Sequence, residues 1–166
     1  MTRDNPGDET IRGLPFRLEN SPFYLMARAI SKATRAIDGA LGATRFSQTQ
    51  WRVLITLSER GPLSIGELAP AIFVESSALG RAVARMEREG LVKRKTDPDD
   101  RRITRVSLSP DGRLRMEELK AVVAAEIDRL LEGFTAEDVR TLNAVLVRIS
   151  RTAEESERRR GADTSE

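Results

Sequence analysis

Charged residues crowd one short stretch of the chain, between Lys93 and Arg105, and they are the first candidates for a binding function. The stretch contains Asp97-Pro98-Asp99-Asp100, followed at once by Arg101-Arg102. Guanidinium groups bind phosphate oxygens and the edges of bases, often through two parallel hydrogen bonds. Carboxylates oppose phosphate binding by their charge. If this loop reaches a phosphate backbone, its acids must therefore contribute through geometry.

The residues that most enzymes use for catalysis are missing. The chain has no histidine and no cysteine, so it lacks the commonest general base, the thiolate nucleophile and the usual ligands of zinc and copper. The remaining carboxylates, lysines, serines and tyrosine show no recognisable catalytic spacing. We therefore predict no enzymatic activity, no catalytic residues, no cofactor and no metal site.

The net charge of +2 is unevenly spread over the 166 residues. The window from Ser76 to Arg105 holds nine basic and five acidic residues, whereas the segment from Val106 to the end holds 10 basic and 13 acidic residues. A local basic patch on a nearly neutral chain indicates a polyanion bound at one face. An ordinary charged surface is the alternative.

The composition is that of a single small domain, with 39% hydrophobic and 33% charged residues. No apolar run approaches the roughly 20 residues that a membrane helix needs. The first residues lack the apolar core of a signal peptide. We therefore expect no membrane partner and a cytoplasmic location.

Capping signals and a 3.6-residue apolar period predict several helices. Ser21-Pro22 can begin the first of them, with serine at the N-cap and proline at the first helical position. Capping boxes are expected at Ser47–Gln50 and at Ser64–Glu67, each opening a helix. Pro70 should bend the second of these or end it early. A further helix runs from about Ser76 to Glu89, and Gly90 stands where a left-handed cap places glycine.

The period then changes to two, which indicates a β-hairpin. Its strands are expected at Leu91–Lys95 and Ile103–Leu108, joined by the proline- and aspartate-rich turn. Ser109-Pro110 opens a long helix that ends at Gly133, and Thr135 caps a last helix.

A short helix, a turn of about four residues and a longer helix have helix-turn-helix proportions, and the hairpin that follows makes this a winged variant. Three blocks of the sequence, QWRVLITLSERGPLSIGELA, ESSALGRAVARMEREGLVKRKTDPDDRR and VSLSPDGR, resemble the MarR family of transcriptional regulators, over about residues 23–151. The resemblance implies a mainly α fold with a small β wing: a winged helix-turn-helix in an entwined helical homodimer that binds duplex DNA.

This organisation assigns each part of the chain a role. We expect a flexible N-terminal arm at residues 1–20, a dimerisation helix at 21–46, the DNA-binding lobe at 47–109, further dimerisation helices at 110–153 and a flexible tail at 154–166. The long terminal helices have few other apolar partners, so a dimer is expected, although a monomer that folds them onto itself is the alternative. A dimer predicts a pseudo-palindromic operator with half-sites roughly 34–36 Å apart.

The recognition helix needs small polar residues at its start, because its backbone must approach phosphates and bases closely. Arg81 can reach a guanine edge, and for Arg88 the alternative role of complementing the helix dipole is preferred. Ordinary N-capping is the alternative role of the serines. Gly80 stands where the family usually has threonine or serine. The candidates for DNA contact on this helix are Ser76, Ser77, Ala78, Gly80, Arg81 and Arg85.

The wing candidates are Asp100, Arg101 and Arg102. We expect Arg102 to enter the minor groove, where guanidinium groups respond to narrow width and negative potential. In an extended segment, positions two apart point to the same side, so the Asp100 carboxylate is expected to hold the Arg102 guanidinium. Arg101 is expected to bind a flanking phosphate. A loose surface ion pair is the alternative.

The family resemblance further implies a repressor that a small aromatic or anionic effector releases from DNA. By that resemblance, the effector pocket lies among the first helix, the second helix and the start of the long helix. Its candidate residues are Phe23, Tyr24, Arg28, Trp51 and Arg52, and simple packing in the core is the alternative for the aromatic ones. The alternative function is a winged-helix scaffold for protein–protein interaction without DNA readout.

Overall fold

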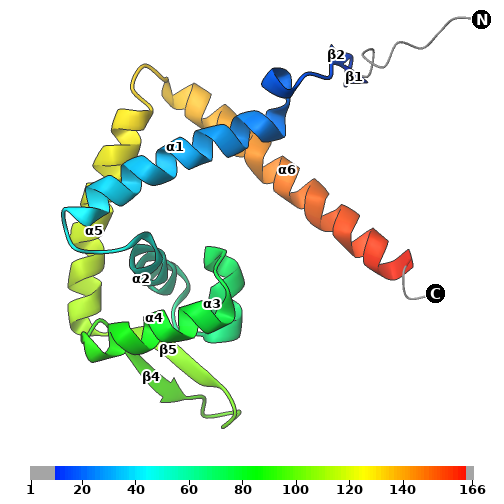
Figure 1. Cartoon of the computed structure of the whole chain (residues 1–166). Helices are drawn as coiled ribbons and strands as arrows, with labels where there is room; N and C mark the ends of the chain where they lie inside the picture. Colours follow the sequence, from blue (N-terminus) through cyan, green and yellow to red (C-terminus); the bar gives the residue numbers. More distant parts are fainter. Residues whose placement is uncertain (1–9, 164–166) are drawn as a thin grey trace, which may run out of the picture. The chain divides into compact units, whose positions relative to one another are not determined.

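The computed structural model describes residues 10–163, and describes side chains as far as residue 161. These residues are mostly helical and carry small antiparallel sheets. They fall into two compact units, the first reaching to Leu130 and the second beginning at Leu131. The winged helix-turn-helix lies wholly within the first unit (Figure 1).

The first unit opens with a small hairpin and a long helix. Strands β1 (Thr10–Ile11) and β2 (Leu14–Pro15) pair, and a 3₁₀ turn, η1 (Leu18–Asn20), precedes helix α1 (Pro22–Gly42). Pro22 occupies the first helical position, as predicted, although the Ser21 side chain makes no capping hydrogen bond. Of the arm expected at residues 1–20, residues 1–9 lie outside the described residues, and the hairpin and 3₁₀ turn occupy the rest.

Both predicted capping boxes are confirmed. Helix α2 (Gln48–Arg60) begins with Ser47 Oγ accepting from the Gln50 amide at 3.2 Å, while Gln50 Oε1 accepts from the Ser47 amide at 2.9 Å. Helix α3 (Ile65–Ile72) begins in the same way, with distances of 3.3 and 2.8 Å between the groups of Ser64 and Glu67. These reciprocal bonds satisfy amides that a helix terminus would otherwise leave without partners.

We expected Pro70 to bend α3 or to end it early; the early end is wrong, and the bend stays a prediction. The helix continues to Ile72 and ends at Phe73, which adopts the left-handed conformation with φ 57° and ψ 48°. Pro70 removes only the amide that would donate to the carbonyl of Gly66, four residues earlier. Both residues are exposed, so water can satisfy that carbonyl.

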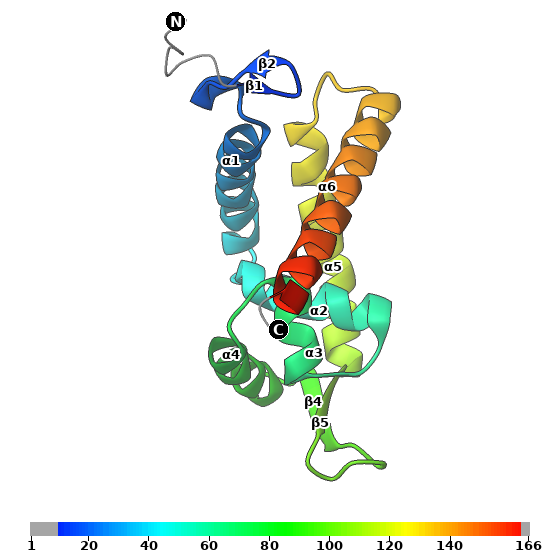
Figure 2. The same ribbon diagram turned by 90° about the vertical axis from the view of Figure 1, so that its right-hand side faces the viewer.

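The second helix of the helix-turn-helix and the wing match the predicted order. Helix α4 (Ser76–Arg88) is followed by Gly90 with φ 76°, the conformation predicted for it. Strands β4 (Val92–Thr96) and β5 (Thr104–Leu108) form the antiparallel wing, with Arg94 opposite Val106. A two-residue strand, β3 (Leu63–Ser64), pairs with the other edge of β5. The hairpin projects from the helices of the lobe (Figures 1 and 2).

One apolar core joins these elements. Leu54 of α2, Leu68 of α3 and Leu79 of α4 are fully buried, as is Val106 of the wing. Helix α5 (Pro110–Leu130) contacts α1, α2 and β5 and adds Met116, Leu119 and Val123 to this core. The base of the wing is therefore part of the core, whereas its tip is exposed.

The second unit consists mainly of helix α6 (Ala136–Asp163). Thr135 and Asp138 cap it reciprocally, with the Thr135 amide donating to Asp138 Oδ2 at 2.8 Å. The helix runs through residues that we expected in the tail. Ion pairing between Arg158 and Glu154 at 3.7 Å accompanies this longer helix, whose last part is rich in good helix formers. In residues 10–163, none of the helices is both long and apolar enough to span a membrane.

Candidate nucleic-acid interface

Helix α4 presents one face to the core and the opposite face to solvent. Leu79, Val83 and Met86 form the buried stripe at helical spacing. Residues three or four positions apart share a face, so Ser77, Arg81 and Arg88 lie opposite this stripe, and all three are exposed. The exposed face therefore carries a hydroxyl in its first turn and two guanidinium groups farther along.

The predicted recognition residues all lie off the buried stripe. Ser76, Ser77, Arg81 and Arg85 are exposed, and Ala78 and Gly80 are half-buried. The N-cap is Glu75, which makes no side-chain capping bond, so neither serine serves as the N-cap. Arg88, for which the helix dipole was the preferred partner, shares the exposed face. Arg88 is seven residues, or two helical turns, from Arg81. This spacing in the sequence could have placed it among the candidates for DNA contact.

Arg85 differs from the other arginines of this helix, because it is engaged within the protein. Its Nε donates to Glu89 Oε1 at 2.7 Å, and Glu89 Oε2 accepts from the Gln50 side chain at 3.1 Å. Arg85 also lines a hollow of about 380 Å³ together with Arg45, Phe46 and Gln50. An exposed pair of this kind contributes only about 0.3–0.5 kcal/mol, so it orients Arg85 weakly.

The acids of the wing loop bind main-chain amides. Asp97 Oδ1 accepts from the amides of Asp99 at 2.9 Å and Asp100 at 3.3 Å. Asp100 Oδ1 accepts from the Arg102 amide at 2.9 Å. The Ile103 amide closes the turn by donating to the Asp100 carbonyl at 2.9 Å. Small acidic side chains that bind their own backbone two residues on are typical of tight turns.

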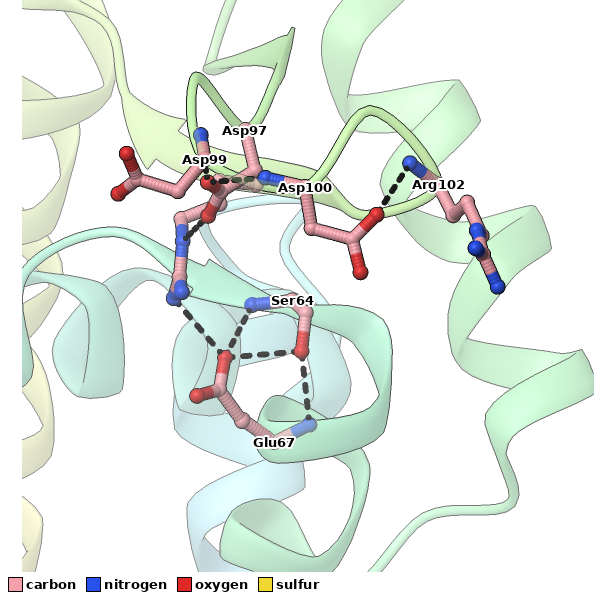
Figure 3. A network of polar contacts seen from close by, with 7 residues as sticks. Ser64, Glu67, Asp97, Asp99, Asp100 and Arg102 are labelled. Atoms are coloured by element: carbon pink, nitrogen blue, oxygen red, sulfur yellow. Dashed lines mark hydrogen bonds and ion pairs between the residues drawn. The ribbon is translucent and has the colours of Figure 1, made fainter.

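The expected grip of the Asp100 carboxylate on the Arg102 guanidinium is therefore not observed. That expectation assumed an extended segment, but residues 101 and 102 lie in a turn. The carboxylate of Asp100 takes the backbone amide instead, and the Arg102 side chain extends away from it (Figure 3). Both arginines of the turn, Arg101 and Arg102, are exposed.

The ion pair at the wing involves residues that sequence reasoning missed. Arg105 Nε donates to Asp97 Oδ2, and Arg105 Nη1 donates to Glu67 Oε2 at 3.1 Å. The hydrogen bond from Arg105 lowers the pKa of Asp97, and the return interaction raises the pKa of Arg105. Hydrogen bonds from the Ser64 amide and hydroxyl lower the pKa of Glu67. Arg105 and Glu67 are 38 residues apart, so no local pattern could reveal this contact.

Ion pairing divides the arginines of α4 and of the wing into two groups. Arg85, Arg94 and Arg105 each bind a carboxylate. In the part of the chain that the structure describes, no ion pair engages the side chains of a second group: Arg81, Arg88, Arg101 and Arg102. These guanidinium groups belong to the exposed face of α4 and to the tip of the wing, and they remain available to an anionic partner.

The five predicted pocket residues lie on two helices and differ in their surroundings. Phe23, 67% exposed, and Tyr24 lie near the N-terminal end of α1, where Arg28 is also exposed. Trp51 packs against the core, and Arg52 Nη1 donates to the Ile72 carbonyl at 3.3 Å. Helix α2 lies beside the C-terminal end of α1 in both views (Figures 1 and 2). A rise of about 1.5 Å per residue puts Phe23 roughly 27 Å from Leu41 at that end.

Groups of acids that could hold a metal ion are also absent between residues 10 and 161. No three Asp or Glu side chains gather there in a suitable arrangement. The candidate site is thus a surface of unpaired arginines and small residues.

The sequence and the fold are similar to those of known proteins. The model of the MarR family matches residues 46–104, which contain the helix-turn-helix and most of the wing. The HTH-type transcriptional repressor IacR of Pseudomonas putida is 32% identical over 131 residues, which cover 79% of this chain and 78% of that repressor.

Solved structures of MarR proteins are also similar to this chain. A MarR family transcriptional regulator from Silicibacter pomeroyi is 32% identical, with a TM-score of 0.71, over 80% of this chain and 90% of that one. A mutant MarR from E. coli, complexed with operator DNA, is 25% identical with a TM-score of 0.68, over 75% and 90% of the two chains. On the identity and coverage shared with these proteins, the chain belongs to the MarR family of transcriptional regulators.

Proposed function

We propose that the chain acts as a homodimeric, sequence-specific DNA-binding repressor in the cytoplasm, and that its role is binding, not catalysis. The observation that carries this proposal is the set of unpaired arginines on the exposed face of α4 and at the tip of the wing. The relative IacR is named a transcriptional repressor, and the E. coli neighbour is bound to operator DNA. Both support repression through an operator.

The exposed face of α4 is suited to the major groove. Ser76 and Ser77 stand at the helix N-terminus, where amides and hydroxyls bind phosphate oxygens. Arg81 lies one turn farther on and can read a guanine edge, and Arg88 can reach a base or a phosphate two turns later. Ala78 and Gly80 add no bulk near this surface. Arg85 is proposed as a secondary contact, because binding would compete with its pair to Glu89.

The tip of the wing is suited to the minor groove. Arg102 would enter the groove and Arg101 would bind a flanking phosphate. The role of Asp100 changes from that first expected: it fixes the main chain at Arg102 and leaves the guanidinium free. A wing that docks proteins has no need of two adjacent unpaired arginines, which disfavours the scaffold alternative.

A dimer accounts for apolar surface that one chain leaves exposed. Phe23 and Ile30 of α1 and Leu142 of α6 are between 46% and 67% exposed. Burial of apolar area stabilises association by about 25 cal/mol per Å², so a second copy would stabilise these helices. The predicted effector pocket can then draw on both copies, because Phe23 and Trp51 need not come from one chain. A small aromatic or anionic effector remains a prediction.

Binding to the DNA upstream of the protein's own gene tests the proposal. Arg102→Ala should weaken binding to a fluorescent duplex about 5- to 100-fold, as loss of one specific guanidinium contact does. Lys120→Ala removes the same charge from an exposed position on α5 and should change affinity little. Equal losses for the two variants, or no binding by the wild type, would contradict the proposal.

A further inference from the structure

A continuous chain of hydrogen bonds leads from the start of α3 to the tip of the wing (Figure 3). Ser64 donates through its amide and hydroxyl to Glu67 Oε2, both at 2.8 Å. The same carboxylate oxygen accepts from Arg105, which also donates to Asp97. Asp97 then accepts from the amides of Asp99 and Asp100. Ser64 and Glu67 stand at the start of α3 and the other residues belong to the wing, so this network joins the helix-turn-helix to the wing.

Asp97 is the central acid of this network, and it is unusually protected. Its side chain is 6% exposed, against 37% for Arg105 and 51% for Glu67. One oxygen is taken by Arg105 and the other by two main-chain amides. A buried carboxylate needs such partners, because an unpaired one is costly. Asp97 therefore has one stable orientation, and it determines the path of the loop.

The loop that Asp97 organises carries Arg102. Asp100, whose amide binds Asp97, in turn accepts from the Arg102 amide at 2.9 Å. The carboxylates of Asp97 and Asp100 thus fix the backbone of the turn. Moving Asp97 would move Asp100, and with it the point from which the Arg102 side chain leaves the main chain.

The carboxylates of Glu67, Asp97 and Asp100 lie near the proposed DNA-binding surface, where their charge alone is unfavourable because it repels phosphates. Exposed ion pairs also contribute little to stability. We propose that Arg105, together with Asp97 and Glu67, is a positioning unit that braces the wing against α3 and thereby presents Arg102 to the minor groove. The proposal rests on the proposed DNA-binding function, and it assigns these three residues a role without direct contact with DNA.

A role through charge and a role through positioning predict opposite changes in DNA affinity when an acid is replaced, so one measurement distinguishes them. If the acids act only through charge, Asp97→Asn and Glu67→Gln each remove a negative charge and should tighten DNA binding. If they act through positioning, both should weaken it. Asp99→Asn is the matched control, since it removes the same charge from the same turn and the Asp99 carboxylate makes no hydrogen bond or ion pair within residues 10–161. It should leave binding unchanged or tighten it slightly.

The affinity measurement uses fluorescence anisotropy of the full-length protein on a duplex that it binds. Asp97→Asn should weaken binding by at least about threefold, the range of coupled neighbouring residues. Arg105→Lys keeps the charge but loses the planar fork that binds two carboxylates, so it too should weaken binding. In an Arg102→Ala background, Asp97→Asn should cause no further loss, because its effect passes through Arg102. A full further loss there, or tighter binding by Asp97→Asn, would overturn the proposal.

A second readout does not depend on DNA. The chain has no cysteine, so Arg101→Cys allows a single spin label at the tip of the wing. Its electron paramagnetic resonance spectrum should show restricted motion in the otherwise wild-type protein and faster motion once Asp97→Asn or Arg105→Lys is added. Equal spectra would overturn the positioning role even if the protein binds no duplex. Failure of DNA binding with the expected spectra would instead contradict the proposed function.

Discussion

Gly112, the third residue of α5, lies against the main chain at the end of the helix-turn-helix. A Cβ atom at this position would come within 1.9 Å of the Leu91 carbonyl oxygen and 2.9 Å of its carbon. Ordinary contacts begin at about 3.4 Å, so Gly112→Ala requires an opening of about 1.5 Å. The obstacle is backbone, which cannot move aside as a side chain can. We therefore expect this substitution to be strongly destabilising.

The magnitude follows from what holds Leu91 in place. Its carbonyl accepts from the Ser109 amide at 3.1 Å, the Ser109 hydroxyl donates chiefly to the adjacent Gly90 carbonyl, and the same hydroxyl accepts from the Gly112 amide at 2.8 Å. Overpacking a tight site costs about 1–3 kcal/mol. Each hydrogen bond lost adds about 0.5–1.5 kcal/mol. Gly112→Ala should therefore lower the free energy of unfolding by about 2–4 kcal/mol.

Gly80→Ala is the matched control, because Gly80 also lies in a helix, α4, but a Cβ there would meet nothing within 4 Å. Alanine is favoured over glycine in helices by about 1 kcal/mol, so this variant should be more stable than the wild type. Urea unfolding followed by circular dichroism, at one protein concentration, measures both. With a slope near 2 kcal/mol per M, the midpoint should fall by about 1–2 M for Gly112→Ala and rise by up to about 0.5 M for Gly80→Ala. Equal midpoints for the two variants would refute the close approach at Leu91.

Three further predictions concern the turn, pH and salt. Phe73 is 90% exposed with φ 57°, so Phe73→Gly loses no burial, relieves left-handed strain and should stabilise the protein by about 0.5–1 kcal/mol in the same unfolding assay. The hydrogen bond from Arg105 lowers the folded-state pKa of Asp97. The ionised carboxylate therefore contributes its full stability above its ordinary pKa, about 4, and this contribution is lost as the pH falls below that value. The difference in unfolding free energy between wild type and Asp97→Asn should shrink in acid, and a constant difference would contradict this. DNA affinity should fall linearly with the logarithm of salt concentration, and Arg101→Ala should reduce the slope by about one, whereas an unchanged slope would exclude a phosphate contact.

Local signals in the sequence predicted much of the fold. The capping boxes at Ser47 and Ser64 and the cap at Gly90 all depend on residues within a few positions of one another, and the structure confirms them. The change of apolar period from 3.6 to two identified the wing for the same reason. The turn at Arg102 was predicted wrongly, because an extended conformation was assumed there and the short-range hydrogen bonds of Asp100 favour a turn.

Long-range contacts were beyond local reasoning. Nothing near Arg105 in the sequence indicates that it reaches Glu67, because strand β5 and helix α3 meet only in the folded lobe. The hydrogen bond between Gln50 of α2 and Glu89 is also long-range, since 39 residues separate its partners. The Arg85–Glu89 pair, by contrast, has the local spacing of four residues. The acidic residues of the wing could be noticed in the sequence, but their division between main-chain amides and a distant arginine depends on how the lobe folds.

Selection of binding sites from random duplex DNA asks directly whether paired recognition helices read a specific sequence. The purified protein is mixed with a pool of duplexes, and bound sequences are recovered and sequenced over several rounds. We expect an enriched inverted repeat whose half-sites are centred about 10–10.5 base pairs apart, as a dimer with two recognition helices requires. Recovery of no enriched sequence, or of a single unrepeated site, would contradict a dimeric DNA-binding repressor.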